Sequence, residues 1–206
     1  EIMYAPFGAN ENKPHGRPRR PGPLYAKLAE KGAVYGAVQG YEKPLWFKTA
    51  KVKKEASTWE RSQTHEAVAE ECFAVRDDAG VIDISGASRF EVSGPDAGGF
   101  LDNLSCNRLP KKDGRIVLTL FHGQNGGIMT EQSITRVHQE LYYLVGPILS
   151  EHRDMHWMQQ HSNGYDVQIR NLTDQYSGVL LTGPNARDIL QQLTIEDLSN
   201  SAFPWL

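Results

Sequence analysis

The sequence has few or none of the features that mark several common protein classes. Its 206 residues include two cysteines, Cys72 and Cys106, whose spacing fits neither a zinc motif nor a disulfide framework. We expect buried or partly buried thiols in a reducing compartment, with a disulfide as the alternative. No run of about 18 apolar residues is present, so we expect no transmembrane helix. Neither GxGxxG nor a Walker lysine occurs, so the sequence gives no reason to expect nucleotide binding.

Positive charge is concentrated at the start of the chain. Residues 1–61 contain 12 Lys and Arg against 6 Asp and Glu, whereas residues 62–206 contain 10 against 19. The basic part is rich in proline and aromatic residues and has no nucleic-acid module such as a helix-turn-helix. We therefore expect no nucleic-acid partner. Residues 1–60 are predicted to be an extended, basic, Pro- and aromatic-rich connector, and residues 61–206 to form the folded domain.

Hydrophobic periodicity predicts an α+β domain. A helix is expected over residues 64–78, with Val68, Cys72 and Val75 on one apolar stripe, and Gly80 follows its end. Stretches in which apolar and polar residues alternate predict strands. The other expected elements are a short helix over 24–31, helices over 97–104 and 150–161, and strands over 81–85, 89–93, 116–120, 133–137, 141–145 and 166–170.

A strand-turn-helix pattern occurs twice. Residues 93–104 and 182–193 share a Gly-Pro turn followed by a helix with apolar residues on one face. Proline suits the first helical position because no amide hydrogen bond is lost there. We therefore predict mixed or antiparallel sheets with packed helices. Residues 202–206 carry neither a cap nor a polar tail, and we expect the fold to be incomplete at its C-terminal end.

The stretch from Phe121 to Val137 is the best candidate for a functional site. Gly126 and Gly127 predict a tight turn between two strands, and Glu131 is the one carboxylate near the start of the second strand. A rigid hairpin can hold such an acid against a ligand. The alternative is a solvated turn with a surface glutamate.

Three histidines on the predicted helix over residues 150–161 provide a second candidate. His152 and His156 lie four residues apart and His161 follows, a spacing that could bind zinc. Arg153, however, occupies the position where a zinc protease carries its general base, and no clustered acid or cysteine follows. We therefore expect no metal site.

Several motifs, in order along nearly the whole chain, together resemble a known family. They resemble the C-terminal part of dimethylglycine and sarcosine dehydrogenases, which is similar to the glycine-cleavage T-protein, an aminomethyltransferase that binds tetrahydrofolate. The most specific motifs are Gly40-Tyr-Glu-Lys-Pro-Leu-Trp-Phe47 and the Gly126-Gly127 hairpin; Val81-Ile-Asp-Ile-Ser85 and Asp197-Leu-Ser-Asn200 add to them.

The resemblance implies a function for the larger protein. In these enzymes an N-terminal domain with FAD oxidises an N-methyl amine to an iminium ion, and the folate domain captures the one-carbon unit on tetrahydrofolate. The partners implied are folate and an iminium derived from a small N-methyl amine, in the cytoplasm or, in a eukaryote, the mitochondrial matrix. FAD would be bound only by an N-terminal part outside this sequence. No oligomeric state is indicated.

The resemblance also implies roles for individual residues. Glu131 matches a position that is usually Asp, and would be the catalytic carboxylate beside the pterin. Its side chain reaches about 1.5 Å further than that of aspartate. Gly126 and Gly127 would shape the turn, and Thr130 would either hydrogen-bond the carboxylate or cap the strand. Tyr143 would either line the pterin pocket or belong to the core.

Two other functions are open, and the departure from aspartate motivates the first. One is a non-catalytic regulatory or scaffolding member of the same family. The other is a folate-dependent demethylase, which resembles this domain without a flavin half.

Overall fold

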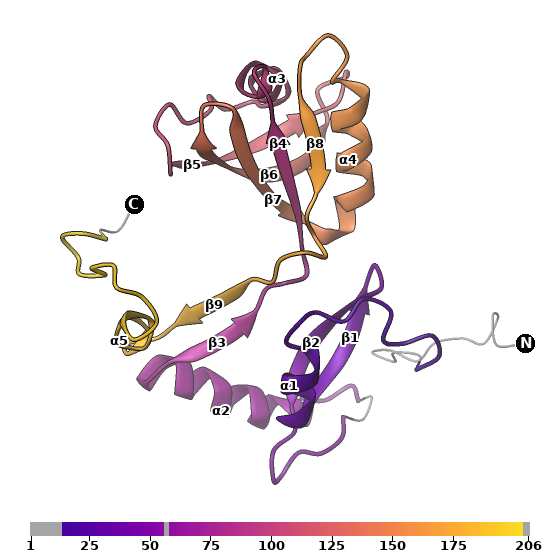
Figure 1. Cartoon of the computed structure of the whole chain (residues 1–206). Coiled ribbons are helices and arrows are strands. Elements are labelled where there is room, and N and C mark those ends of the chain that lie inside the picture. The colour runs from indigo at the N-terminus through magenta and orange to yellow at the C-terminus, as the bar shows by residue number, and fades with distance from the viewer. Residues whose placement is uncertain (1–13, 56–57, 204–206) are drawn as a thin grey trace, which may run out of the picture. The chain divides into compact units, whose positions relative to one another are not determined.

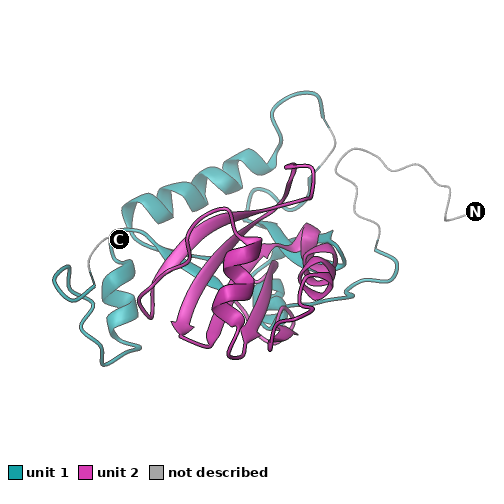
Figure 2. Cartoon of the chain, turned by 90° about the horizontal axis from the view of Figure 1, so that it is seen from above, with its two compact units in different colours: residues 1–84, 178–206 teal, residues 85–177 magenta. Residues whose placement is uncertain are grey.

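The structure is a computed structural model that describes residues 14–55 and 58–203. The chain forms two compact units, Glu1–Ile84 with Gly178–Leu206 (unit 1) and Ser85–Ser177 (unit 2) (Figure 2). The segment before residue 61 therefore shares a unit with later parts of the chain. The expected α+β class with antiparallel sheets is confirmed, because the ladders between the named strands of the described residues are antiparallel.

Unit 1 begins with a short helix and a β-hairpin. The predicted helix is present as α1 (Tyr25–Glu30). Strands β1 (Ala33–Val38) and β2 (Tyr41–Phe47) pair across a two-residue loop, in which Gln39 has φ 52° and Gly40 has φ 76°. Two consecutive positive φ angles are typical of the turns that fit the twist of a hairpin. Within the segment predicted to be a connector, residues 33–47 thus form a β-hairpin.

The helix α2 (Thr64–Asp77) has the predicted extent, but the apolar stripe was assigned to the wrong face. Ala67 is buried and joins Trp46 and Val52 in a small core. Cys72, on the predicted stripe, is exposed. The face that carries Ala67 is the one that packs in unit 1, so tertiary contact overrides a weak apolar pattern.

Both thiols differ from the expectation. Cys72 and Cys106 are free and exposed, and they form no disulfide. A cysteine on an apolar stripe is buried only if that stripe faces the core.

The remaining strands of unit 1 pair over a long sequence separation. Strand β3 (Gly80–Asp83) pairs with β9 (Val179–Thr182), and α5 (Ala186–Gln191) follows β9. Between them, a Cβ at Gly183 would lie 2.4 Å from the Asp78 carbonyl oxygen, so the backbones approach too closely for a side chain.

Unit 2 is built on a five-stranded sheet in the order β5-β6-β7-β4-β8. Helices α3 and α4 accompany the sheet (Figure 1). The elements are β4 (Ala87–Ser93), α3 (Ala97–Leu104), β5 (Ile116–His122), β6 (Ile128–His138), β7 (Leu141–Pro147), the 3₁₀ turn η2 (Ile148–Ser150), α4 (Glu151–Gln160) and β8 (Gln168–Asn171).

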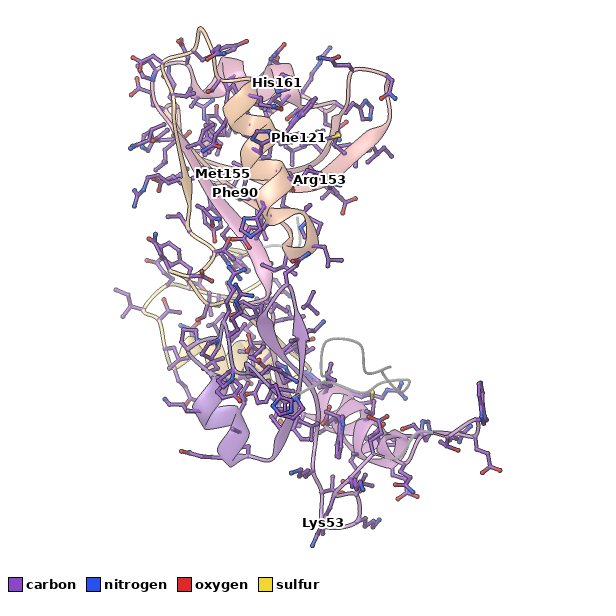
Figure 3. The ribbon with its side chains drawn as sticks, turned by 90° about the vertical axis from the view of Figure 1, so that its right-hand side faces the viewer. Lys53, Phe90, Phe121, Arg153, Met155 and His161 are labelled. Carbon is purple, nitrogen blue, oxygen red and sulfur yellow. The ribbon has the colours of Figure 1, made fainter. Side chains whose placement is uncertain are left out.

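One face of this sheet forms the core of unit 2. Phe90, Leu144 and Ile134 are neighbours across β4, β7 and β6, and all three are fully buried. Phe100 of α3 and Met158 of α4 pack against the same cluster. Figure 3 labels Phe90 as well as Phe121 of β5, which belongs to this core. Burial of this much aromatic and aliphatic surface is the main force holding unit 2 together.

The other face of the sheet carries exposed apolar side chains. Ile116 and Leu118 of β5 are 65% and 55% exposed. Since side chains alternate along a strand, residues one position away from the core residues form this outer face. Among the described residues, no helix is both long and apolar enough to cross a membrane.

Candidate functional site

The hairpin between β5 and β6 has the predicted tight turn. The amide of Gly123 donates to the Gly127 carbonyl oxygen at 2.9 Å, and the amide of Gly126 donates to the Gly123 carbonyl oxygen at 2.9 Å. Gly126 has φ 77°, a conformation that favours glycine, whereas Gly127 has no positive φ angle. The turn therefore requires glycine at Gly126 and fixes the start of β6.

Glu131 lies on the outer face of the sheet. It pairs with Leu120 of β5, and its side chain is exposed. Its neighbours Thr130 and Gln132 are buried on the core side. Among the described residues, the Glu131 carboxylate forms no hydrogen bond or ion pair. It is therefore available to a ligand, but no side chain in the described part of the chain holds it in one orientation.

Thr130 points away from Glu131, into the core. Its hydroxyl donates to Asp154 Oδ2 at 2.8 Å. The expected hydrogen bond from Thr130 to the Glu131 carboxylate is therefore not formed. Adjacent residues of a strand project to opposite faces, which explains why the two side chains do not meet.

The partner of Thr130 is a buried carboxylate that sequence reasoning missed. Asp154 of α4 is 1% exposed, and its Oδ2 also accepts hydrogen bonds from Gln132 Nε2 at 2.8 Å and Ser150 Oγ at 2.6 Å. Arg153, labelled in Figure 3, lies beside it and donates to the Met129 carbonyl oxygen. The cluster fastens α4 to β6, and it sets which residues of β6 face inward. The polar residues Thr130 and Gln132, two positions apart on β6, were the sequence pattern that could have indicated this buried cluster.

Tyr143 of β7 is on the same outer face as Glu131. It pairs with Thr135 of β6 and Glu91 of β4, and is half-buried. It lines a cavity of about 240 Å³, together with Glu91 and Tyr176. Burial raises the pKa of the Tyr143 hydroxyl, while the charge of Arg89 and a hydrogen bond from its side chain act in the opposite direction. The hydroxyl thus stays protonated and able to donate at neutral pH.

The outer face brings Glu131 and Tyr143 onto one surface without joining them in one cavity. Glu131 is four residues along β6 from Thr135, the partner of Tyr143, which is about 13 Å at 3.3 Å per residue. The cavity around Tyr143 is not lined by Glu131. A ligand that touches both side chains must therefore be elongated and lie along the sheet.

The histidines of α4 and its C-cap residue His161 do not form a metal-binding group in the described structure. His161 Nδ1 is 2.8 Å from the Trp157 carbonyl oxygen, and the two rings are 4.0 Å apart. Within the described ranges, no group of three or more His, Cys, Asp or Glu side chains could hold a metal ion.

Comparison with known proteins gives a consistent result. The sequence pattern of the family described as "GCVT N-terminal domain" matches residues 24–206. An aminomethyltransferase of Alkaliphilus oremlandii is 37% identical over 146 residues, or 70% of this chain and 40% of that protein. The mitochondrial dimethylglycine dehydrogenase of Mus musculus is 33% identical over 195 residues, or 93% of this chain and 22% of that protein. The chain thus spans less than half the length of either relative.

A solved structure has the same fold. The glycine cleavage system aminomethyltransferase T of Bartonella henselae superposes with a TM-score of 0.71 at 23% identity, covering 87% of this chain and 45% of that chain. Because the family pattern covers most of the sequence and this structure shares the fold, the chain belongs to the GCVT N-terminal domain family.

Proposed function

We propose that this chain is the tetrahydrofolate-dependent one-carbon transfer domain of a flavin-linked N-methyl amine dehydrogenase. The observation that carries the proposal is the similarity to dimethylglycine dehydrogenase over 93% of the chain at 33% identity, compared with aminomethyltransferases that match 70% of the chain at 37% identity or 88% at 28% identity. The longer match favours a parent enzyme of the dehydrogenase type. FAD would then be bound by another part of that parent.

The outer face of unit 2 fits a folate. Tyr143 and Tyr176 offer aromatic surfaces at a cavity, on which the benzene ring in the tail of a folate can stack while its bicyclic ring lies at Glu131. Bound tetrahydrofolate would supply the amine nitrogens that accept the one-carbon unit. An elongated molecule of this kind suits two contact points that lie about 13 Å apart along the strand.

Glu131 has the properties of a proton acceptor for this transfer. Its carboxylate has no partner among the described residues, so it can stabilise a cationic iminium by charge. It can then accept the proton released when a nitrogen forms a bond to the iminium carbon. Gly126, Gly127 and the β5 pairing set where the carboxylate is presented, and Thr130 contributes by anchoring β6 to Asp154.

The test uses the full-length protein that carries this sequence. Tetrahydrofolate binding is measured by calorimetry, and one-carbon capture is measured as 5,10-methylenetetrahydrofolate formed from dimethylglycine or sarcosine. We expect Glu131→Gln to leave binding nearly unchanged and to lower the capture rate by about 100-fold or more, the usual contribution of a general base. Glu131→Asp should retain capture, because it keeps the charge and restores the residue that is usual at this position in the family that the chain resembles.

Glu140→Gln is the matched control. Glu140 is an exposed glutamate of the β6–β7 turn; its backbone amide donates to His138 Nδ1 at 3.3 Å, and its backbone carbonyl oxygen accepts from the Gly94 amide at 3.0 Å. This variant should behave as the wild type. Absence of tetrahydrofolate binding, or capture that is equally fast after Glu131→Gln, would contradict the proposal.

The exposure of Glu131 favours one alternative, a non-catalytic regulatory or scaffolding member of the family. Glutamate has a longer and more mobile side chain than aspartate, and a misplacement of about 1 Å can reduce a rate by about 100-fold. A parent protein that oxidises neither sarcosine nor dimethylglycine, and forms a stable complex with another protein, would support this alternative. A parent without a flavin domain that demethylates its donor would instead be a folate-dependent demethylase.

A further inference from the structure

A second cavity of unit 2 lies beside the first turn of α3, the helix labelled in Figure 1. Its volume is about 500 Å³, and it has no part in the proposed folate chemistry. The residues that matter in its lining are the helix positions Gly98, Gly99 and Asp102, the loop cations Arg108 and Lys111, and Tyr142 of β7.

Gly98 and Gly99, in the first turn of α3, line this cavity. The N-cap residue Asp96 makes no side-chain hydrogen bond to the helix, and its Oδ2 instead accepts from the Asp166 amide at 2.8 Å. Among the described residues, the amides of Gly98 and Gly99 have no hydrogen-bond acceptor. Neither residue has a Cβ to shield these donors. The partial positive charge of the helix start adds to their attraction for an anion.

Tyr142 provides the independent sign of a ligand. Its side chain is 97% buried, since only 3% is exposed. Its hydroxyl has no hydrogen-bond partner among the described residues. This oxygen lies at the first turn of α3, because a Cβ built at Gly98 would be 3.1 Å from it. The ring of Tyr142 is buried, whereas its unpaired hydroxyl is not among the buried polar atoms of the described residues, so the hydroxyl reaches the cavity and can donate to a bound acceptor.

The charges around the cavity favour an anion. Arg108 and Lys111 form no ion pair within the described part of the chain. Arg136 also lines the cavity, but its Nε is paired with Asp113 Oδ1 at 2.7 Å. The lining contains one carboxylate, Asp102, which is exposed. Two unpaired cations therefore face one acid.

The geometry points to a binding site for an oxyanion, the phosphate or carboxylate group of a small metabolite, at the start of α3. The amides of Gly98 and Gly99 and the Tyr142 hydroxyl would donate to the anion oxygens. Arg108 and Lys111 would supply charge from the rim. The second copy of the repeat has Arg187 and Asp188 at the positions of the two glycines, so the feature belongs to α3 alone.

The test follows the amides of the ¹⁵N-labelled 206-residue chain by NMR during titration with sodium phosphate, sodium acetate and sodium chloride at constant ionic strength. We expect the Gly98 and Gly99 amide signals to move downfield and to saturate below about 10 mM of the preferred oxyanion. Saturation with phosphate alone assigns a phosphoryl ligand, and saturation with acetate assigns a carboxylate ligand. Either result supports the site, whereas no saturation, or an equal response to chloride, overturns it.

Gly99→Asp separates binding from folding. A Cβ at Gly99 meets nothing within 4 Å, so the variant should fold. It should be at least as stable as the wild type, because glycine is unfavourable in a helix and an acid is favourable in its first turn. The added negative charge should raise the oxyanion dissociation constant by about tenfold or more. Gly99→Asn, with nearly the same bulk and no charge, should bind more tightly than Gly99→Asp.

Tyr142→Phe tests the unpaired hydroxyl separately. The change keeps the ring in the core and removes one donor, so it should weaken oxyanion binding by about fivefold to tenfold with little change in the thermal midpoint. Binding to Gly99→Asp that is as tight as wild-type binding would refute the proposal, as would unchanged binding to Tyr142→Phe.

Discussion

The buried carboxylate of Asp154 should be the most important polar side chain for the stability of unit 2. Asp154→Ala removes the acceptor of three hydrogen bonds, from Thr130 at 2.8 Å, Gln132 at 2.8 Å and Ser150 at 2.6 Å. A hydrogen bond to a charged group contributes about 1.5–3 kcal/mol, and a buried donor left without an acceptor costs about 1–3 kcal/mol.

The three donors are not equally affected when the Asp154 carboxylate is removed as their acceptor. Ser150 Oγ is also 3.1 Å from the Pro147 carbonyl oxygen, so it keeps a partner. Thr130 can turn to Ser150 Oγ, at 3.2 Å. Gln132 Nε2 is left with Thr130 Oγ1 at 3.5 Å, and its Oε1 already has no partner. We therefore expect the free energy of unfolding to fall by about 3 kcal/mol, less than the sum of three full hydrogen bonds.

The assay is urea unfolding of the chain followed by circular dichroism. Asp102→Ala is the matched control, because Asp102 is an exposed aspartate in a helix of the same unit and should change stability by less than about 0.5 kcal/mol. Asp154→Asn, which keeps the volume and one oxygen, should lose less than Asp154→Ala. A change for Asp154→Ala as small as that of the control would refute this account of the cluster.

The coupling within the cluster is also measurable. Thr130→Val should cost about 1 kcal/mol by itself, and the double variant with Asp154→Ala should cost less than the two single changes added together. Hydrogen exchange at β6 should become faster in Asp154→Ala, because Thr130 and Gln132 fasten that strand to α4. Additive losses would show that the two side chains act separately.

Two further predictions concern other parts of the chain. Gly146→Ala should destabilise unit 2 by about 2 kcal/mol, because its Cβ would lie 2.4 Å from the Gln132 side chain, whereas Gly99→Ala meets open space and should not destabilise; both are measured by urea unfolding. Burial raises the pKa of Tyr35 to about 12, and its hydroxyl donates to the Tyr25 carbonyl oxygen at 2.8 Å. Because this pKa lies above the unfolded value of about 10, the stability that Tyr35 contributes is present below pH 10 and is lost between about pH 10 and pH 12. The unfolding midpoint should fall less between pH 9 and pH 11 in Tyr35→Phe than in the wild type. Equal falls would contradict the raised pKa of Tyr35.

Local sequence patterns were enough to locate most elements of unit 2. The periodic apolar residues of α3, the alternation along β6 and the glycines before it all gave the observed structures. In each case the favoured conformation depends on residues that are close in the sequence, such as Gly126 with its positive φ angle. The placement of Glu131 on a strand next to a tight turn follows from the same local rules.

The partners of those elements were decided by contacts that are distant in the sequence. Strand β3 pairs with β9 across about 100 residues, and Thr130 meets an acid 24 positions later in the chain. No local pattern favours one such partner over another, because long-range pairing depends on how the whole apolar surface is buried. The same holds for the exposure of Cys72 and for the cavity beside Tyr143. Residue order thus settles where strands and helices form, whereas the packed core settles which side chains face each other, and therefore what unit 2 can bind.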